Sequence, residues 1–388
     1  MRRVCDLLGM PQNRFATIHV VGSNGKSSVS VLTAALLAGE GMASGVYLSP
    51  HLDRWSERIR VRGAEIGADD FGDAVARTAE AAAIAERGFE PGERVTQFEA
   101  ATAAAFQALA GAGVDVGVIE AGLGGRLDAT NVIGSKVTAV TSISLEHTDL
   151  LGESVEEIAA EKLAVLRAHS TLVLGPVDAA VASLAERTAR GLQANVVRVD
   201  AADPRAASLP DGYPRINFSV ALAAAEAFLG RRIDSAGAER VAASVRLPAR
   251  LEIVDSDPPM ILDAAHNPAG AAAIAEALPE LSRGRPVIAV LAVLADKPAE
   301  GICAPIAAIS AVVICTEIPA PALEGVGRPG ARSHPAAELA VACGASTTEI
   351  AADPNAALDR ARALARERGG IVLVAGSFYL LASLREPS

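Results

Sequence analysis

The sequence predicts an α/β protein with two domains, a larger one built on a mostly parallel sheet and a smaller Rossmann-like one after it. Three observations lead to this prediction. The chain has 388 residues, which is too long for one ordinary core. Short apolar runs alternate with Ala-rich segments of helical character, and this alternation breaks at Val245–Ile253 (VRLPARLEI) before it restarts. We therefore expect domains at residues 1–249 and 250–388.

The larger domain is expected to begin with a buried strand, because Ala16–Val21 is an apolar run that ends at a Gly-rich turn. Further short apolar runs predict the other strands, and the Ala-rich stretches between them predict helices on both faces of the sheet. The expected strands are Ala16–Val21, Ser44–Leu48, Val114–Ile119, Val137–Ile143 and Thr171–Leu174, and the expected helices are Ser28–Glu40, Phe71–Ala85, Glu99–Ala110 and Ser219–Leu229.

The smaller domain repeats this pattern after the proline-containing segment. A short apolar run comes first, and a helix is expected to begin at Ala269. The expected strands are Met260–Leu262, Val287–Leu294, Ala311–Ile314 and Ile371–Val374.

Composition excludes several classes of protein. Apolar residues make up 51% of the chain and charged residues 21%, which is typical of a globular protein. A net charge of −11 without a basic tract argues against nucleic-acid binding, which depends on Lys and Arg. The longest uncharged apolar run, Gly301–Thr316, contains Pro305 and falls short of the roughly 20 residues that span a bilayer. With no signal-peptide pattern behind the first arginines, we expect a cytoplasmic protein without a membrane segment.

The cysteines and lysines carry further information. The four cysteines include no C-x-x-C pair, so we expect buried thiols and neither a zinc site nor disulfides. Only four of the 35 basic residues are lysines, namely Lys26, Lys136, Lys162 and Lys297. A lysine that persists in an arginine-rich chain indicates a place where a compact or deprotonatable amine is needed.

The segment Gly22–Ser27 (GSNGKS) lies between an expected strand and an expected helix, which is the arrangement of a phosphate-binding loop. In such a loop, backbone N–H groups face the phosphates, Lys26 supplies a positive charge, and a serine hydroxyl can reach Mg²⁺. The spacing differs from G-x-x-x-x-G-K-[ST], because Val20 stands where that pattern has glycine. The alternative is a Gly-rich turn of no function.

Gly22–Lys26 resembles the G-T-N-G-K loop of the Mur ligase superfamily, and longer segments select one branch of it. Glu120–Asn131 (EAGLGGRLDATN) matches the signature of the folylpolyglutamate synthase/dihydrofolate synthase family almost residue for residue. The resemblance runs from about residue 3 to Gly376–Phe378. The other matching segments are Tyr47–Leu52, Glu57–Val61, Glu146–Asp149, Glu161–Lys162 and Asp263–Pro268.

The resemblance implies an ATP-dependent ligase that adds L-glutamate to a folate-type carboxylate through an acyl phosphate. The acceptor would be tetrahydrofolate with its glutamate tail, dihydropteroate, or both. Folate or dihydropteroate, L-glutamate and ATP would then be the binding partners, and family members are commonly monomers. The fold implied is a P-loop-type ATPase domain followed by a Rossmann-like glutamate-ligase domain.

The resemblance also implies the site residues, and the residues themselves support some of these roles. Glu120 ends an expected strand, where open α/β sheets bind ligands. Thr96 and Glu99 also have the spacing of a helix capping box. The catalytic residues would be Lys26, Lys162, His147 and Glu120. Two Mg²⁺ ions would be held by Ser49, Glu120, His147 and a carbamylated Lys162. The nucleotide would contact Gly22, Ser23, Asn24, Gly25, Lys26, Ser27, Ser28, Asn217, Arg250, Asp263 and His266, and the pterin substrate Thr96, Phe98, Glu99, Arg126, Leu127 and Asp128.

Two departures from the family pattern keep alternatives open. Ser27 stands where the folate branch usually has glycine, and a hydroxyl there is more like the cell-wall Mur ligases. The chain is also expected to start just after the D-L-G-type segment that contacts dihydropteroate in bifunctional members. The alternatives are a Mur-type ligase acting on a cell-wall precursor and a truncated paralogue without catalysis.

Overall fold

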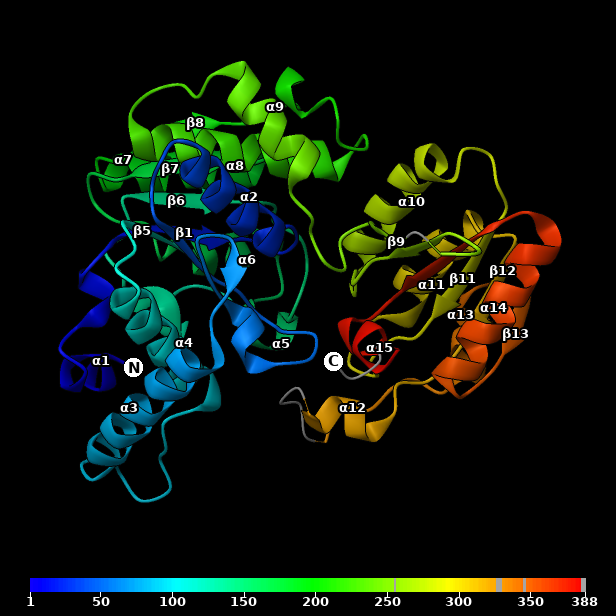
Figure 1. Ribbon diagram of the computed structural model, residues 1–388, viewed down its shortest axis with the longest axis horizontal. Helices are drawn as coiled ribbons and strands as arrows, with labels where there is room; N and C mark the ends of the chain where they lie inside the picture. The colour runs from blue at the N-terminus through cyan, green and yellow to red at the C-terminus, as the bar shows by residue number, and fades with distance from the viewer. Residues whose placement is uncertain (255, 326–329, 345–346, 385–388) are drawn as a thin grey trace. The chain divides into compact units, whose positions relative to one another are not determined.

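The computed structural model describes residues 1–254, 256–325, 330–344 and 347–384. The chain divides into two compact units, which are considered one at a time (Figure 1). The first contains residues Met1–Leu209 and Pro214–Val245, and the second contains Pro210–Tyr213 and Arg246–Ser388. Each unit is an α/β structure around its own sheet, which confirms the predicted fold class.

The first unit is built on an eight-stranded sheet with the order β4-β3-β2-β5-β1-β6-β7-β8. From β2 to β8 every neighbouring pair is parallel, whereas β3 and β4 add an antiparallel hairpin at one edge. The strands are β1 Ala16–Val21, β2 Ser44–Tyr47, β3 Ile59–Val61, β4 Ala64–Glu65, β5 Val116–Glu120, β6 Val137–Val140, β7 Thr171–Leu174 and β8 Asn195–Arg198.

Helices cover both faces of this sheet. On one face α2 packs on β2 and β5 and against α9, and Thr33 of α2 reaches α8 (Figure 1). On the other face, apolar side chains of β1, β2 and β5 pack with α4, α6 and α7. The helices of this part are α1 Arg2–Leu7, α2 Lys26–Gly39, α3 Ala68–Glu86, α4 Gln97–Gly111, α5 Thr148–Leu151, α6 Val155–Leu163, α7 Ala179–Gly191, α8 Tyr213–Leu229 and α9 Ser235–Ser244.

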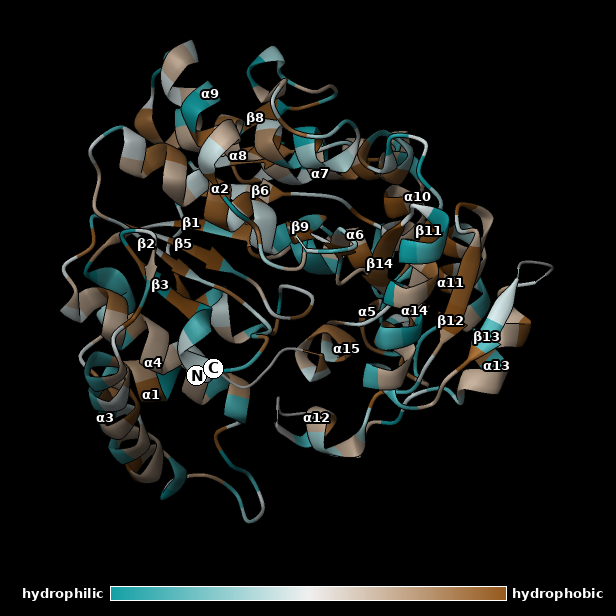
Figure 2. Ribbon diagram, turned by 45° about the vertical axis from the view of Figure 1, so that its right-hand side comes forward, coloured by the Kyte–Doolittle hydropathy of each residue, from teal (hydrophilic) through white to brown (hydrophobic). Residues whose placement is uncertain are grey.

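The second unit has a six-stranded sheet with the order β13-β12-β11-β14-β10-β9, in which only the pair β10–β9 is antiparallel. Its central strands β11, β12 and β14 are strongly apolar (Figure 2). The strands are β9 Glu252–Val254, β10 Met260–Leu262, β11 Val287–Leu291, β12 Val312–Cys315, β13 Thr348–Ile350 and β14 Ile371–Ala375, and the helices are α10 Pro268–Ser282, α11 Ala299–Ala308, α12 Ala320–Gly325, α13 Ala336–Ala342, α14 Pro354–Arg368 and α15 Phe378–Ser383.

Every strand expected from the sequence is present, with ends that shift by a few residues. β1 has the expected bounds, while the expected strand Val137–Ile143 ends at Val140. The helix expected at Ser28 begins two residues earlier, at Lys26. All four cysteines are buried free thiols, as expected. Within the described part of the chain, no helix combines the length and the apolar content needed to cross a bilayer.

Candidate active site

The predicted phosphate loop joins the carboxyl end of β1 to the start of α2. Gly25 is the N-cap of α2 and has φ of 84°, a left-handed conformation that glycine adopts at little cost. No side chain among the described residues caps this helix. The N–H groups of its first turn therefore remain available, and they sit at the positive end of the helix dipole. This is an anion-binding geometry.

The residues that follow β6 hold the loop in shape. Ser142 accepts from Ser23 N through its carbonyl oxygen (2.8 Å) and from Asn24 N through its Oγ (3.1 Å). The hydroxyl of Thr141 donates to the Asn24 carbonyl oxygen, and a Cβ on Gly22 would overlap that hydroxyl. The N–H groups of Ser23 and Asn24 are thus used inside the protein. Those of Gly25 to Ser28 are the ones at the helix start that can meet a phosphate.

Asn217, from helix α8, lies against the same loop. A Cβ added to Gly25 would overlap its Oδ1 atom, and the side chain of Asn217 is buried. The structure therefore brings together two residues that are 192 positions apart in the chain (217 − 25) and that were both expected at the nucleotide.

Two lysine amines converge on one carbonyl oxygen of the loop. Lys26 Nζ donates to Gly22 O (3.0 Å) and to Ser23 O (3.1 Å), and Lys162 Nζ donates to Gly22 O (3.0 Å). Lys162 comes from α6, and its Nζ also lies 2.8 Å from Glu146 Oε1. The structure thus joins two of the four lysines at the predicted site.

The electrostatics of this cluster follow from its burial. Lys162 is 2% exposed, and burial lowers its pKa although the charge of Glu146 acts in the opposite direction. Burial alone would raise the pKa of Glu146, but the charges of Lys26 and Lys162 outweigh it and bring that pKa to about 2. Glu146 is therefore a carboxylate at neutral pH, while the amine of Lys162 loses its proton more readily than an exposed lysine.

Glu120 ends β5 at the same edge of the sheet, as predicted. Its carboxylate is 1% exposed and accepts from the Ser27 hydroxyl (3.0 Å) and from Ser49 N (3.2 Å). A buried carboxylate beside two serines is a hard-oxygen donor set that suits Mg²⁺. Among the described residues, no group of three or more His, Cys, Asp or Glu side chains could hold a metal. A magnesium ion here would thus need phosphate oxygens among its ligands, as is usual for this ion.

His147 follows β6 and caps the short helix α5. Its φ is 47°, and its carbonyl oxygen accepts from Leu150 N and Leu151 N. In the chain, His147 directly follows Glu146, which is the ion-pair partner of Lys162.

Asp128, expected to line a substrate pocket, organises its own loop. Its Oδ2 accepts from Gly122 N (3.0 Å) and Leu123 N (2.9 Å), and its Oδ1 accepts from the N–H and the hydroxyl of Thr130. Nearby, Arg126 Nε lies 3.1 Å from Glu161, and the Leu127 side chain is 91% exposed.

Thr96, Phe98 and Glu99 begin α4. Thr96 Oγ1 accepts from Glu99 N (3.2 Å) and Glu99 Oε2 accepts from Thr96 N (2.9 Å), which confirms the capping box. The ring of Phe98 lies against Gly122, where a Cβ would overlap it. Phe98 thus contacts the loop that Asp128 holds.

Three predicted residues belong to the second unit. Asp263, which follows β10, is buried and accepts from Leu251 N (2.8 Å), Ala265 N (2.8 Å) and the Tyr213 hydroxyl (2.6 Å). Burial raises the pKa of Asp263, and the charge of Arg250 opposes this. The Arg250 guanidinium lies 6.0 Å from the centre of the Phe378 ring, and His266 Nδ1 is 3.0 Å from Ala264 O.

Sequence reasoning missed Glu146, Thr141 and Ser142 as members of this site. Glu146 stands in a segment that resembles the family, so this resemblance could have pointed to Glu146 as a site residue. Thr141 and Ser142 directly follow a strand that pairs with β1, so a polar side chain there falls beside the loop.

The sequence of this chain is similar to those of known proteins. Residues 249–378 match the family model described as "Mur ligase, glutamate ligase domain". The chain is 33% identical to the dihydrofolate synthase/folylpolyglutamate synthase of Mycobacterium tuberculosis, over 95% of this chain and 85% of that protein.

Solved structures are also similar to this chain. The folylpolyglutamate synthase of Mycobacterium tuberculosis in complex with ADP is similar with a TM-score of 0.90 and 30% identity, over 100% of this chain and 94% of that one. The bifunctional folylpolyglutamate synthase/dihydrofolate synthase of Yersinia pestis, complexed with AMPPNP and Mn ion, has a TM-score of 0.83 and 30% identity, over 98% and 90%. The chain belongs to the dihydrofolate synthase/folylpolyglutamate synthase family.

Proposed function

We propose that this protein is an ATP-dependent ligase that joins the amine of L-glutamate to the carboxylate of a folate-type substrate and forms ADP and phosphate. The observation that carries the proposal is the cluster at the loop of Gly22, where the partly buried Lys26 and the buried Lys162 share one carbonyl acceptor. The family to which the chain belongs catalyses this class of reaction, and the names of its relatives include both dihydrofolate and polyglutamate synthesis.

The phosphates of ATP would bind at the start of α2. Its first-turn N–H groups, the charge of Lys26 and the nearby amide of Asn217 fit an anionic nucleotide. Ser23 and Asn24 would act by holding the loop, since their N–H groups bond to Ser142. Ser27 and Ser28 would lie in the first turn beside the phosphates.

Two magnesium ions would be held at the edge formed by Ser49, Glu120, His147 and a carbamylated Lys162. The hydrogen bonds of Glu120 to Ser27 and Ser49 support the first of these sites. When bound, such ions neutralise phosphate charge and orient the transferring group. A manganese ion with a nucleotide analogue in the Yersinia pestis relative supports a divalent metal in this family.

Carbamylation of Lys162 requires its neutral amine to attack CO₂ and then to lose a proton. Burial lowers the pKa of this amine, which supports the reaction. The product is an anion, so the present ion pair with Glu146 would have to open. The carbamate would serve, together with His147, as a ligand of the second Mg²⁺, whose charge would offset its own.

The reaction has two chemical steps. An oxygen of the substrate carboxylate attacks the γ-phosphorus of ATP, the bond to ADP breaks, and an acyl phosphate forms. The glutamate amine then attacks the acyl carbon, loses a proton, and phosphate leaves as the amide forms. Lys26 would offset the charge on the transferring phosphoryl group, and the rigid loop would position it.

The remaining predicted residues are assigned by family resemblance and their positions. Thr96, Phe98, Glu99, Arg126, Leu127 and Asp128 would form the folate site, with Asp128 shaping the loop on which Phe98 packs. Residues 1–249 would bind ATP and residues 250–388 would form the glutamate-ligase domain. Arg250, Asp263 and His266 are assigned to the nucleotide by family resemblance. We expect a cytoplasmic monomer.

ADP release from the purified protein tests this function. With ATP, Mg²⁺ and L-glutamate, ADP should appear only when dihydropteroate or tetrahydrofolate is added, and a Lys26→Met variant should reduce the rate at least about a hundredfold. Lys136→Met, which alters a lysine stacked on Phe228, is the matched control. A response to a muramoyl acceptor but to neither pterin would instead identify a cell-wall ligase, and no response to any acid would identify a non-catalytic paralogue.

A further inference from the structure

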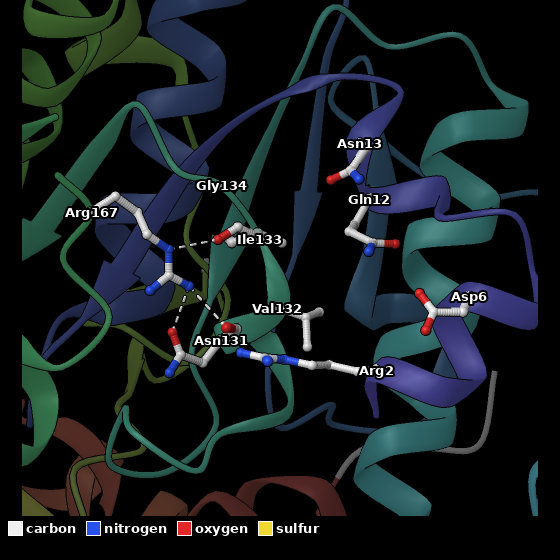
Figure 3. Close-up of a pocket in the computed structure, with 9 residues that line it drawn as sticks. All are labelled: Arg2, Asp6, Gln12, Asn13, Asn131, Val132, Ile133, Gly134 and Arg167. Atoms are coloured by element: carbon white, nitrogen blue, oxygen red, sulfur yellow. Dashed lines mark hydrogen bonds between the residues drawn. The ribbon is translucent and has the colours of Figure 1, made fainter. Parts of the chain in front are cut away.

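A cavity of about 460 Å³ opens in the first unit, apart from the phosphate loop. The residues that matter for its chemistry are Arg2, Asp6, Gln12, Asn13, Asn131 and Arg167 (Figure 3). None of the residues assigned above to nucleotide, metal or folate lines it.

The cavity lies at the opposite edge of the sheet from the phosphate loop. Gln12 precedes β1, Gly134 precedes β6 and Arg167 precedes β7, and these three strands run parallel. The phosphate loop follows the other end of β1, which is six residues long. A strand of that length spans about 20 Å, so one ligand of amino-acid size cannot reach both places.

One end of the cavity is cationic. Arg167 donates from Nε to Ile133 O (3.0 Å) and from one Nη to the carbonyl and side-chain oxygens of Asn131 (2.9 and 2.7 Å), all uncharged acceptors. Arg2 extends from α1 toward Asn131 (Figure 3). Burial lowers the pKa of Arg167, and the charge of Arg2 lowers it further. Within the described residues neither guanidinium has a carboxylate partner, so an anion would relieve their repulsion.

The other wall is anionic. The exposed carboxylate of Asp6 lies on it, on the far side of the cavity from Arg167 (Figure 3). Its negative charge favours a ligand that carries a cationic group as well as an anionic one. Gln12 also lines the cavity, but its Oε1 atom is buried within the protein and does not reach the ligand space.

We propose that this cavity binds an amino dicarboxylate, with its carboxylates at Arg2 and Arg167 and its ammonium group at Asp6. The charges are complementary: two arginines and one aspartate give the cavity +1, and two carboxylates and one ammonium give the ligand −1. Planar guanidinium groups hold carboxylates through paired N–H bonds. In a chain of net charge −11, this is a local site where an anion is attracted. The proposal does not depend on the ligase function.

Calorimetric titration with L-aspartate, which the ligase reaction does not consume, tests this site. The protein should bind L-aspartate equally well with and without ADP and Mg²⁺, because the phosphate loop is elsewhere. Succinate, which has the same carboxylates but no ammonium group, should bind about tenfold more weakly. Arg2→Gln should weaken L-aspartate binding at least about tenfold, and Asp6→Asn should remove the preference over succinate. Both positions are exposed, so these variants are expected to fold.

Arg187→Gln on α7 is the matched control, since Arg187 is an exposed arginine of the same unit whose Nη bonds to Ser183. It should leave binding unchanged. The proposal is overturned if L-aspartate does not bind at millimolar concentration, if ADP displaces it, or if Arg2→Gln binds it as the parent does. Equal binding of succinate and L-aspartate would overturn the role of Asp6. If the protein shows no ligase activity, none of these binding outcomes changes, because the titration measures only the affinity for L-aspartate and succinate.

Discussion

Lys162 Nζ lies 2.8 Å from Glu146 Oε1, and the two side chains are only 2% and 7% exposed. A buried cation is tolerated here because a buried anion accompanies it, and removing either partner would leave an uncompensated charge. The pair also decides how easily the amine of Lys162 becomes neutral, because Glu146 favours its protonated form while burial favours its neutral form.

We predict that Lys162 reacts with CO₂. Protein equilibrated with ¹³C-labelled bicarbonate and Mg²⁺ should show a carbamate carbon signal by NMR. Lys162→Met should remove the signal and lower ligase turnover at least about a hundredfold, because a methionine side chain cannot form the oxygen ligand. Lys136→Met should keep both the signal and the turnover. A signal that survives in Lys162→Met would show that another amine reacts.

The Ser27–Glu120 pair gives a second prediction. Glu120→Gln should raise the Mg²⁺ concentration needed for half-maximal ADP formation at least about tenfold, because an amide is a weaker ligand for a hard cation than a carboxylate. Ser27→Gly should shift this concentration by less than about threefold, since Ser49 N still bonds to Glu120. It should lower stability by about 0.5–1 kcal/mol because glycine weakens a helix. Equal effects of the two variants on Mg²⁺ dependence would contradict the metal role of Glu120.

Asp128 supports a third prediction. In the parent protein, both carboxylate oxygens of Asp128 accept hydrogen bonds from backbone N–H groups. Asp128→Asn replaces one of these oxygens by an NH₂ group, which cannot accept, so two or more hydrogen bonds to the side chain would be lost. We expect a loss of stability of roughly 2–4 kcal/mol, measured by urea unfolding, together with a raised KM for the folate-type acceptor. Asp73→Asn, at an exposed position on α3, should change neither quantity. A raised KM without any loss of stability would mean that Asp128 contacts the substrate directly and does not act through its loop.

His19 gives a prediction on pH. The residue is fully buried and its Nε2 lies 2.8 Å from Thr130 Oγ1, and burial lowers its pKa from 6.5 to about 3. Between pH 6.5 and 3 the unfolded chain therefore binds a proton that the folded chain does not. This contribution to stability is complete above pH 6.5 and is lost as pH falls toward 3, at about 1.4 kcal/mol per pH unit.

The measurement compares the free energy of unfolding at pH 6 and pH 4 in the parent and in His19→Gln. The variant should lose less stability over this range, because one of its titrating groups is gone. His51, whose pKa burial lowers to about 4, keeps part of the slope in both proteins. His169→Gln, at an exposed histidine, should have the parent's slope. If His19→Gln also keeps that slope, His19 is not the neutral buried group described here.

Local patterns were enough to predict the central strands of both sheets, but not the edges. β1 and β7 have the predicted bounds because their apolar runs are closed by turn residues. β8 was missed because all four of its residues, Asn195–Arg198, are exposed and show no buried face. β9 was missed because it is three residues long and lies in the segment taken as a linker. Pairing with a neighbour, not local composition, makes such edge segments into strands.

In the site, too, local patterns predicted the contiguous features but not the contacts between distant segments. The phosphate loop is contiguous, so its place between a strand and a helix was readable. The ion pair of Lys162 with Glu146 joins a helix to a loop after β6, and no spacing rule predicts it. Asp128, expected at the substrate, also has a structural role, since it is the N-cap of the short helix Ala129–Val132 and accepts a hydrogen bond from Thr130 N. A capping aspartate two residues before a threonine was a signal for a structural carboxylate.

The bonds from Thr141 and Ser142 to the phosphate loop have a consequence for association kinetics. A loop whose shape is already fixed by a neighbouring strand does not have to order itself when a nucleotide arrives. The entropy of ordering is then lost during folding, so the encounter itself should limit the rate at which nucleotide binds. The half-life of the complex, and not its rate of formation, becomes the quantity that substitutions around Gly22 would change.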